Sequence, residues 1–475
     1  MKAEAALERG RLPFYLRSLI VAYARRRRSA NLASRTKPSS TLLLVSLLID
    51  FCADVWYNTA RFAKRRKMGM LKRWQESGVL STLKSRRAVN LAGARQCGKT
   101  TLALALPLTT SRHFTLDDPK IAEVARNDPS GFVARATGET LIIDEIQKIP
   151  ELLNCIKINV DRNGERGQYL FTGSANLHFV KAVTDSLAGR VGRVRLRTLS
   201  LGEINGASPD FLAAAFERRF PSRVAGCNKR TAISFATRGG YPETVGMDAR
   251  ERRGWFTSYL NDLLMKDVRD ITEIRKLDTL RVIAEWLLAH SSKFFEISEL
   301  AAKSGVSKAT VENYISTLKA MFLFDEILPW SKSDYGRIGK RSKFLASDSA
   351  LVANILGRTD ESIYMDGDMS GKLIETWVYQ NLASLADLNA DYEISHYRDS
   401  LKREIDFIVE RSDGSMLGIE VKAGSSFGAE DFKHLKWFAK NLAKGEFTGI
   451  VLYAGEETLR FGEGFYAVPL AALGA

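Results

Sequence analysis

The stretch from Ala88 to Leu106, AVNLAGARQCGKTTLALAL, constrains the fold more strongly than any other part of the chain. It starts with an apolar run, continues through a loop bounded by Gly93 and Gly98, and then takes on helical periodicity. A buried strand, a glycine-bounded turn and a helix N-terminus in this order are typical of a phosphate-binding loop. The two glycines allow the backbone to curl so that successive N–H groups point at phosphate oxygens, and the helix dipole adds positive charge there.

The residues of this loop predict that ATP binds together with Mg²⁺. Lys99 is placed to reach the β- and γ-phosphates, and the hydroxyl of Thr100 is placed to ligate Mg²⁺. Gly93, Gly98 and Thr101 complete the expected nucleotide contacts. The alternative is a chance glycine-rich turn, which the strand before the loop and the helix after it argue against.

A second apolar strand carries the acids that this chemistry needs. The segment Glu139–Gln147 has four strand-forming residues followed by Asp144 and Glu145, which is the pattern of a Walker B strand. Buried parallel strands read as continuous apolar runs, and their carboxyl ends deliver polar side chains to the ligand crevice. We therefore expect Asp144 to hold Mg²⁺ through water and Glu145 to act as general base on the attacking water.

A third apolar strand, within Gln168–Asn176, ends in small polar residues. The hydroxyl of Ser174 is the first candidate to sense the γ-phosphate, and the amide of Asn176 is the second. The alternative is that these residues only form the turn that ends the strand. Further along, Arg190 is expected to neutralise transition-state charge, either in its own chain or from a neighbouring subunit. A role from a neighbouring subunit implies a homo-oligomer. Arg193 fits a solvated basic face equally well.

The formal net charge of +15 comes mostly from residues 1–67, which hold 15 Lys and Arg against four acids. The apolar run Leu42–Ile49 in this segment is too short to span a bilayer. We expect residues 1–67 to be a basic, disordered extension or the product of an upstream start codon, because organised sequence begins near Met68 and Met70. A basic arm on nucleic acid or on an anionic membrane surface is the alternative.

The positions of the cysteines and histidines bear on the cellular compartment of the protein and on whether it has a metal site. The four cysteines are scattered, with neither the paired spacing of a zinc site nor a disulfide framework, and this indicates a reducing, cytoplasmic compartment. The five histidines show no ligand-like spacing. The sequence contains no apolar run long enough to span a membrane, which argues against a transporter.

The segment Phe295–Trp330 reads as a helix-turn-helix followed by a strand that could serve as a wing. Ser307 is the expected N-cap of the second helix. Lys303, Lys308 and Asn313 are candidate contacts to a DNA backbone. Because the second helix carries few basic residues, a packing or protein-contact module is the alternative.

The motifs of the first half resemble those of a group of bacterial and archaeal AAA-type ATPases that carry a C-terminal domain of unknown function. The segments that carry this resemblance are residues 93–100, 141–145, 171–174, 187–190 and 199–203, with a turn at 239–243 that is also typical of the group. The likeness extends from Met70 to about Ala472 and leaves out the basic extension. Cys97 stands where the group more usually has valine.

The last segment predicts a second cluster of functional side chains. A helix, two strands joined by a tight turn, a second helix and a final strand follow one another after residue 370. This order resembles the restriction-endonuclease-like core, and the resemblance implies that Asp406 and Glu420 ligate a metal ion, with Glu375 completing the shell. Lys422 shares a strand face with Glu420 and is expected to stabilise charge or position the hydrolytic water. A scaffold that does not cleave is the alternative.

The sequence therefore predicts an α/β protein in three parts. A P-loop AAA-type parallel-sheet domain spans residues 68–205, a helical and winged-helix-like region spans 206–345, and a small restriction-endonuclease-like domain spans 346–475. The predicted function is Mg²⁺-dependent ATP hydrolysis that couples the nucleotide state to the downstream parts. An ATP-gated DNA nuclease and a nucleotide-dependent binding switch with negligible turnover are the alternatives. DNA, other proteins and further copies of the chain are candidate partners.

Overall fold

The computed structural model describes residues 71–136, 138–174, 189–268, 276–332 and 341–475. The chain divides into two units, residues 1–70 and residues 71–475. The basic extension belongs to the first unit and lies outside the described residues. Within the described ranges, no helix has both the length and the apolar character that crossing a membrane requires.

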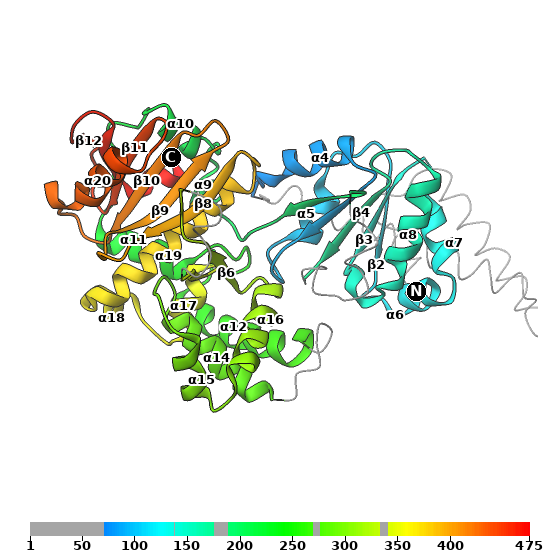
Figure 1. Ribbon diagram of the computed structural model, residues 1–475. Coiled ribbons are helices and arrows are strands. Elements are labelled where there is room, and N and C mark those ends of the chain that lie inside the picture. The colour runs from blue at the N-terminus through cyan, green and yellow to red at the C-terminus, as the bar shows by residue number, and fades with distance from the viewer. Residues whose placement is uncertain (1–70, 137, 175–188, 269–275, 333–340) are drawn as a thin grey trace, which may run out of the picture. The chain divides into compact units, whose positions relative to one another are not determined.

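Five parallel strands form the first sheet (Figure 1). They are β1 (Ala88–Ala92), β2 (Ser111–Thr115), β3 (Thr140–Asp144), β4 (Tyr169–Gly173) and β5 (Val191–Arg195). Their order across the sheet is β2-β3-β4-β1-β5, and every neighbouring pair is parallel. The carboxyl ends of β1, β3 and β4 therefore lie side by side at one end of the sheet, which is where ligands bind in such folds.

Helices cover both faces of this sheet, and Figure 1 shows α7 and α8 on the opposite side from α4. The helices are α4 (Gln75–Ser85), α5 (Lys99–Ala105), α6 (Pro119–Asn127), α7 (Pro129–Val133) and α8 (Glu151–Arg162), with the 3₁₀ turns η1 (Ala134–Ala136) and η2 (Ile146–Lys148). Leu91 and Ile142 pack in one core with α4 and α5, whereas Ile143 and Phe171 pack in another with α6, α7 and α8. Burial on both faces explains the continuous apolar runs, and the predicted α/β domain is confirmed.

Helices dominate the chain between the two larger sheets. They are α9 (Leu201–Asn205), α10 (Phe211–Phe216), α11 (Lys229–Arg238), α12 (Ala249–Asp262), the π-helical segment η4 (Leu263–Asp267), α14 (Leu277–Ala289), α15 (Ile297–Ser304), α16 (Lys308–Ala320), α17 (Ser349–Ile355), α18 (Asp360–Met365) and α19 (Gly367–Ala386). Two short strands, β6 (Phe324–Ile327) and β7 (Lys343–Ala346), pair antiparallel.

Helices α15 and α16 confirm the predicted pair of helices and its turn. Gly305 ends α15 with a left-handed φ of 66°, and the side chain of Ser307 accepts a hydrogen bond from the N–H of Thr310 as the N-cap of α16. Lys303 forms an ion pair with Glu299 at 2.9 Å on the same helix. The winged-helix character and the DNA contacts stay predictions.

The second large sheet has six strands. They are β8 (Tyr392–Arg398), β9 (Glu404–Arg411), β10 (Met416–Lys422), β11 (Phe447–Tyr453), β12 (Leu459–Arg460) and β13 (Phe465–Pro469), with α20 (Lys433–Asn441) and the 3₁₀ turns η6 (Ala429–Phe432) and η7 (Leu470–Gly474). The strand order is β12-β13-β11-β10-β9-β8; β8, β9 and β10 are antiparallel, and β10, β11 and β13 are parallel. The predicted order of helix, hairpin, helix and strand is confirmed, with β8, β12 and β13 added to it.

Two helices cover the two faces of this mixed sheet. Val409 and Ile419 pack in one core with Trp377 of α19, whereas Ile408 packs in another with Phe438 of α20. The first of these cores is continuous with the core of the helical region and runs from α9 to η7. Helix α19 is therefore shared between the helical region and the sheet.

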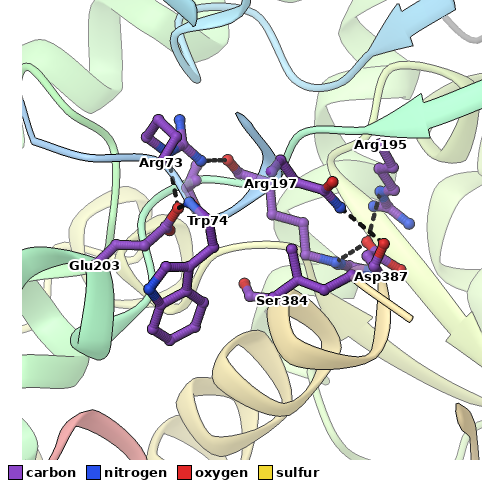
Figure 2. A pocket seen from close by; sticks show the side chains of 10 residues that line it. Arg73, Trp74, Arg195, Arg197, Glu203, Ser384 and Asp387 are labelled. Carbon is purple, nitrogen blue, oxygen red and sulfur yellow. Dashed lines mark hydrogen bonds and ion pairs between the residues drawn. The ribbon is translucent and has the colours of Figure 1, made fainter. Parts of the chain in front are cut away.

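A buried ion-pair cluster joins the end of β5 to β6 and α19. Arg195 pairs with Asp325 at 2.6 Å, and Arg197 pairs with both Asp325 and Asp387, the latter at 2.6 Å. Figure 2 shows Arg195 and Arg197 converging on Asp387 at the end of α19. The hydroxyl of Tyr379 donates to Asp325 at 3.0 Å. Burial would raise the pKa of Asp325, but the two guanidinium groups outweigh it and lower this pKa well below its usual range.

This cluster predicts that Asp325→Ala destabilises the protein strongly. The substitution leaves Arg195 and Arg197 without their shared partner, and removing one partner of a buried ion pair costs about 3–5 kcal/mol. Urea unfolding followed by fluorescence measures the change. Asp413→Ala is the control, because Asp413 pairs with Arg411 on an exposed turn and its loss should shift the midpoint little. Equal shifts for both variants would contradict the prediction.

Candidate functional site

The loop between β1 and α5 has the backbone that anion binding requires. Gln96 and Gly98 adopt left-handed conformations with φ of 61° and 101°. A Cβ atom at Gly93 would lie 2.1 Å from the carbonyl oxygen of Leu196, so glycine alone fits there. Cys97 is fully buried, and its thiol donates to the same carbonyl at 3.3 Å. The close approach of the chain after β5 therefore fixes the shape of the loop.

Lys99 starts α5 and is buried within the loop, with 4% of its surface exposed. Its ammonium donates to the carbonyl oxygens of Gly93 at 3.0 Å and Ala94 at 2.9 Å. Thr101, two residues further on, is exposed on α5. The lysine that is expected to meet the phosphates is thus held at the centre of the loop.

The carboxylate of Asp144 joins three elements at the end of β3. Thr100 of α5 donates its hydroxyl to the two carboxylate oxygens, at 2.8 and 3.0 Å, and Thr172 of β4 also donates to Asp144. These neighbouring hydroxyl and carboxylate groups offer the oxygen ligands that Mg²⁺ prefers. The residues present therefore fit a Mg²⁺-bound nucleotide triphosphate.

Glu145 follows Asp144 in a left-handed conformation with φ of 57°, and its N–H donates to the hydroxyl of Thr172 at 3.3 Å. One oxygen of its carboxylate accepts hydrogen bonds from Ser174, at 3.3 Å, and from the amide of Gln147. Gln147 also donates to Ser174 at 3.1 Å. The structure thus brings Ser174 to the expected base. Asn176 lies outside the described residues.

Arg190 lies far from this loop in its own chain. Val191 pairs with Ala88 at the start of β1, so Arg190 is at the opposite end of the sheet, a five-residue strand or about 16 Å away. Its guanidinium forms an ion pair with Asp161 at 2.5 Å. Arg193 is exposed on β5. A contact between Arg190 and a nucleotide on the loop would therefore have to come from a neighbouring subunit.

Arg73 connects the loop to the chain that follows β5 (Figure 2). Its guanidinium donates to the carbonyl oxygen of Cys97 in the loop at 2.8 Å and to that of Arg197 at 2.6 Å. The same group forms an ion pair with Glu203 of α9 at 2.9 Å. Since Arg197 also pairs with Asp387 at the end of α19, three successive contacts connect the loop to that helix.

A second connection runs through two tyrosines of the helical region. The hydroxyl of Tyr259, on α12, donates to the carbonyl oxygen of Arg95 in the loop at 3.4 Å. The hydroxyl of Tyr241 donates to that of Tyr259 at 3.0 Å, and burial raises the pKa of Tyr241 well above its usual value. Tyr241 directly follows the paired glycines of the turn that the sequence singled out.

Gly239 and Gly240 of this turn lie in positions where a larger residue would be strained or would clash. Gly239 has a left-handed φ of 63°, and a Cβ atom at Gly240 would lie 1.9 Å from the carbonyl oxygen of Leu199. The N–H of Gly240 donates to the carboxylate of Asp348 at 2.9 Å. Gln380 of α19 donates to Leu199 at 3.3 Å and to Asp348 at 3.2 Å. The turn is therefore fixed between the end of the first sheet and α19.

The second predicted cluster forms only in part. Asp406 on β9 and Glu420 on β10 come together, and burial, followed by repulsion from Asp406, raises the pKa of Glu420 well above its usual value. One carboxylate oxygen of Asp406 accepts a hydrogen bond from the N–H of Val421 at 2.9 Å. The ammonium of Lys422 pairs with Asp431 at 3.0 Å. Lys422 is thus engaged with a residue that the sequence analysis did not consider.

A buried lysine lies among these acids. The ammonium of Lys343 pairs with Glu375 at 2.5 Å and lies 3.4 Å from Glu404 and 3.7 Å from Asp406. Burial and the charge of Asp406 raise the pKa of Glu375 to about 8, against the attraction of Lys343. Across the described ranges, no group of three or more His, Cys, Asp or Glu residues is arranged to hold a metal ion. The expected metal shell of Glu375, Asp406 and Glu420 stays a prediction, and the ammonium of Lys343 lies against two of its three carboxylates.

The sequence analysis missed several residues of both clusters. Thr172 and Gln147 carry a weak signal, because each is polar and lies within a few residues of a strand end that points to the loop. His113 on β2 is a further residue near this site. Burial lowers the pKa of its imidazole, and the nearby carboxylate of Asp144 opposes that shift. Arg73 and Lys343 carry no local signal, since their partners are distant in the sequence.

Three protein families match different parts of the chain. Residues 85–205 match the family described as an AAA domain. Residues 230–362 and 370–473 match two families described as domains of unknown function, DUF8612 and DUF4143. The five-stranded parallel sheet and the loop after β1 fit the AAA domain that this match describes, and most of the remaining chain matches two families described as domains of unknown function.

Two curated relatives come from mycobacteria. The uncharacterized protein Rv2008c of Mycobacterium tuberculosis and the uncharacterized protein Mb2031c of Mycobacterium bovis are each 27% identical to this chain over 344 residues. The alignments cover 71% of this chain and 70% of each relative. The similarity therefore extends well beyond the AAA domain.

Two solved structures match parts of the chain only weakly. A DNA polymerase III, gamma subunit-related protein from Thermotoga maritima is 11% identical, with 52% of this chain and 97% of that chain covered and a TM-score of 0.22. The Hsp104–ADP complex of S. cerevisiae is 12% identical, with 68% of this chain and 46% of that chain covered and a TM-score of 0.24. With TM-scores this low, neither structure is a template for this chain.

The geometry of the loop predicts that Gly93→Ala disrupts it. The added methyl group would lie 2.1 Å from a backbone oxygen, and such overpacking costs about 1–3 kcal/mol. We expect a lower urea midpoint and a loss of binding to a fluorescent ATP analogue. Gly254→Ala is the matched control, because Gly254 is exposed on α12 with no atom near a new Cβ. A Gly93→Ala protein that binds the analogue normally would contradict the prediction.

Proposed function

We propose that this protein hydrolyses ATP in a Mg²⁺-dependent reaction at the loop between β1 and α5. The observation that carries the proposal is the grouping of Lys99, Thr100 and Asp144, with Glu145 directly after Asp144 at the end of β3. The match of residues 85–205 to the AAA domain family supports it independently.

Each residue has a role that follows from its position. Backbone N–H groups of the loop and the ammonium of Lys99 bind the phosphates. To do so, the Lys99 ammonium must give up its hydrogen bonds to the carbonyl oxygens of Gly93 and Ala94. Thr100 and Asp144 hold Mg²⁺, which neutralises charge on the phosphates when it is bound. Glu145 accepts the proton of the attacking water.

The contacts of Glu145 hold its carboxylate in one arrangement. Its carboxylate is held by Gln147 and Ser174, so these side chains fix where the base lies and compete with water for its oxygens. This observation favours a second candidate function, a nucleotide-dependent switch with negligible turnover. In that case ATP would bind tightly while Glu145 stays with its two partners.

We further propose that the nucleotide state is passed to the downstream regions through two routes. Arg73 links the carbonyl of Cys97 to Arg197, and Tyr259 links the carbonyl of Arg95 to Tyr241. Both routes reach α19, the first through the ion-pair cluster and the second through the glycine turn beside Gln380. A change in the shape of the loop would therefore alter contacts of one helix from two sides.

Glu145→Gln is expected to lower phosphate release by about 10²–10⁴-fold while ATP binding is retained, because only the proton acceptor is lost. Lys99→Ala should abolish binding itself. Release of phosphate from Mg·ATP, measured with and without duplex DNA, and binding of a fluorescent analogue separate the two effects. Glu151→Gln, on the exposed start of α8, is the matched control. Tight binding with no phosphate release by the unmodified protein would instead establish the switch.

Tyr259→Phe is expected to weaken the second route without loss of nucleotide binding. In the unmodified protein, a non-hydrolysable ATP analogue with Mg²⁺ should slow amide hydrogen exchange in residues 239–243. The variant loses one hydrogen bond to the loop, so we expect affinity to change by less than about tenfold while this protection falls. Tyr364→Phe, on α18, is the matched control. Protection that is unchanged in Tyr259→Phe would rule out this route.

A further inference from the structure

Among the described residues, Lys343 is the most deeply buried lysine or arginine. It lies at the start of β7, and 1% of its side chain is exposed. Three carboxylates surround it at 2.5 to 3.7 Å: those of Glu375 on α19 and of Glu404 and Asp406 on β9. A buried charge is tolerated only when it is paired, and these three groups supply that pairing.

An aromatic ring and a second cation also lie near the ammonium. The ring of Phe294 lies 5.5 Å from it, and the guanidinium of Arg398 lies over the same ring at 4.6 Å. Arg398 also approaches Glu404 at 3.9 Å. The buried ammonium is thus in contact with an aromatic ring as well as with acids from two elements.

These acids are the ones from which a divalent-cation site would be built. Asp406 and Glu420 lie on paired strands, and Glu375 faces them from α19. Carboxylate oxygens are the preferred ligands of Mg²⁺ and Mn²⁺. A divalent ion that bound Glu375 and Asp406 would have to displace the ammonium of Lys343 from two of its three carboxylates while that ammonium stays buried, which is unfavourable.

We propose that Lys343 is the resident cation of this cluster and that it closes a latent divalent-cation site formed by Glu375, Asp406 and Glu420. The C-terminal region then binds no catalytic metal, and its acids serve to fix α19 against β9 through a lysine. Lys422 is consistent with this assignment, since it pairs with Asp431. The proposal is independent of ATP hydrolysis at the loop between β1 and α5.

Mn²⁺ binding to the full chain in the absence of nucleotide tests the proposal. Electron paramagnetic resonance or calorimetry should detect no saturable site in the unmodified protein up to the highest Mn²⁺ concentration tested. Lys343→Met should bind about one Mn²⁺ per chain, with a dissociation constant at least about tenfold below that concentration. Lys372→Met is the matched control, because Lys372 lies on α19, the helix that carries Glu375, and donates to the carbonyl of Ala289. Adding Asp406→Asn to Lys343→Met should remove the new site.

Two outcomes would overturn the proposal. One is a Lys343→Met protein that keeps its far-ultraviolet circular dichroism and its melting temperature but gains no Mn²⁺ site. The other is saturable Mn²⁺ binding by the unmodified protein that Asp406→Asn abolishes, together with metal-dependent cleavage of duplex or single-stranded DNA on a gel. The second test needs only the unmodified protein and the single variant, so it decides the question even where Lys343→Met fails to fold.

Discussion

The carboxylate of Asp144 is the contact on which the geometry of the loop region depends. It accepts hydrogen bonds from Thr100 on α5 and from Thr172 on β4, and so ties the loop helix to two neighbouring strands. Hydrogen bonds to a charged acceptor are stronger than neutral ones, and these are shielded from water because Asp144 is 6% exposed. Loss of this carboxylate would release the helix that carries Lys99 and the strand that precedes Ser174.

The first sheet could be predicted because its signals are local. Continuous apolar runs identified β1, β3 and β4, and the glycine pattern identified the loop, since both depend on residues that are neighbours in the sequence. The reason for one glycine was different from the one expected: Gly93 is required by the carbonyl oxygen of Leu196, about a hundred residues later in the chain. Contacts of this kind leave no pattern in a single sequence.

The acidic cluster of the C-terminal region could also be predicted only in part from the sequence. The two-residue spacing of Glu420 and Lys422, and the pairing of β9 with β10, were readable from strand alternation and a tight turn. Lys343 could not be anticipated, because it precedes that hairpin by more than sixty residues and belongs to a different sheet. One buried lysine changes the chemistry that the acids can perform, although every acid lies where the sequence placed it.

The continuous core from α9 to η7 has a consequence for how such chains evolve. The two regions of unassigned function meet in one apolar interior, and α19 contributes side chains to both. Recombination that joined either region to a new neighbour would expose this interior to water, so the two families are expected to be inherited as a pair. The AAA domain is tied to this interior as well, since Leu201 of α9 packs in the same core and Phe322 packs in a core of the first sheet.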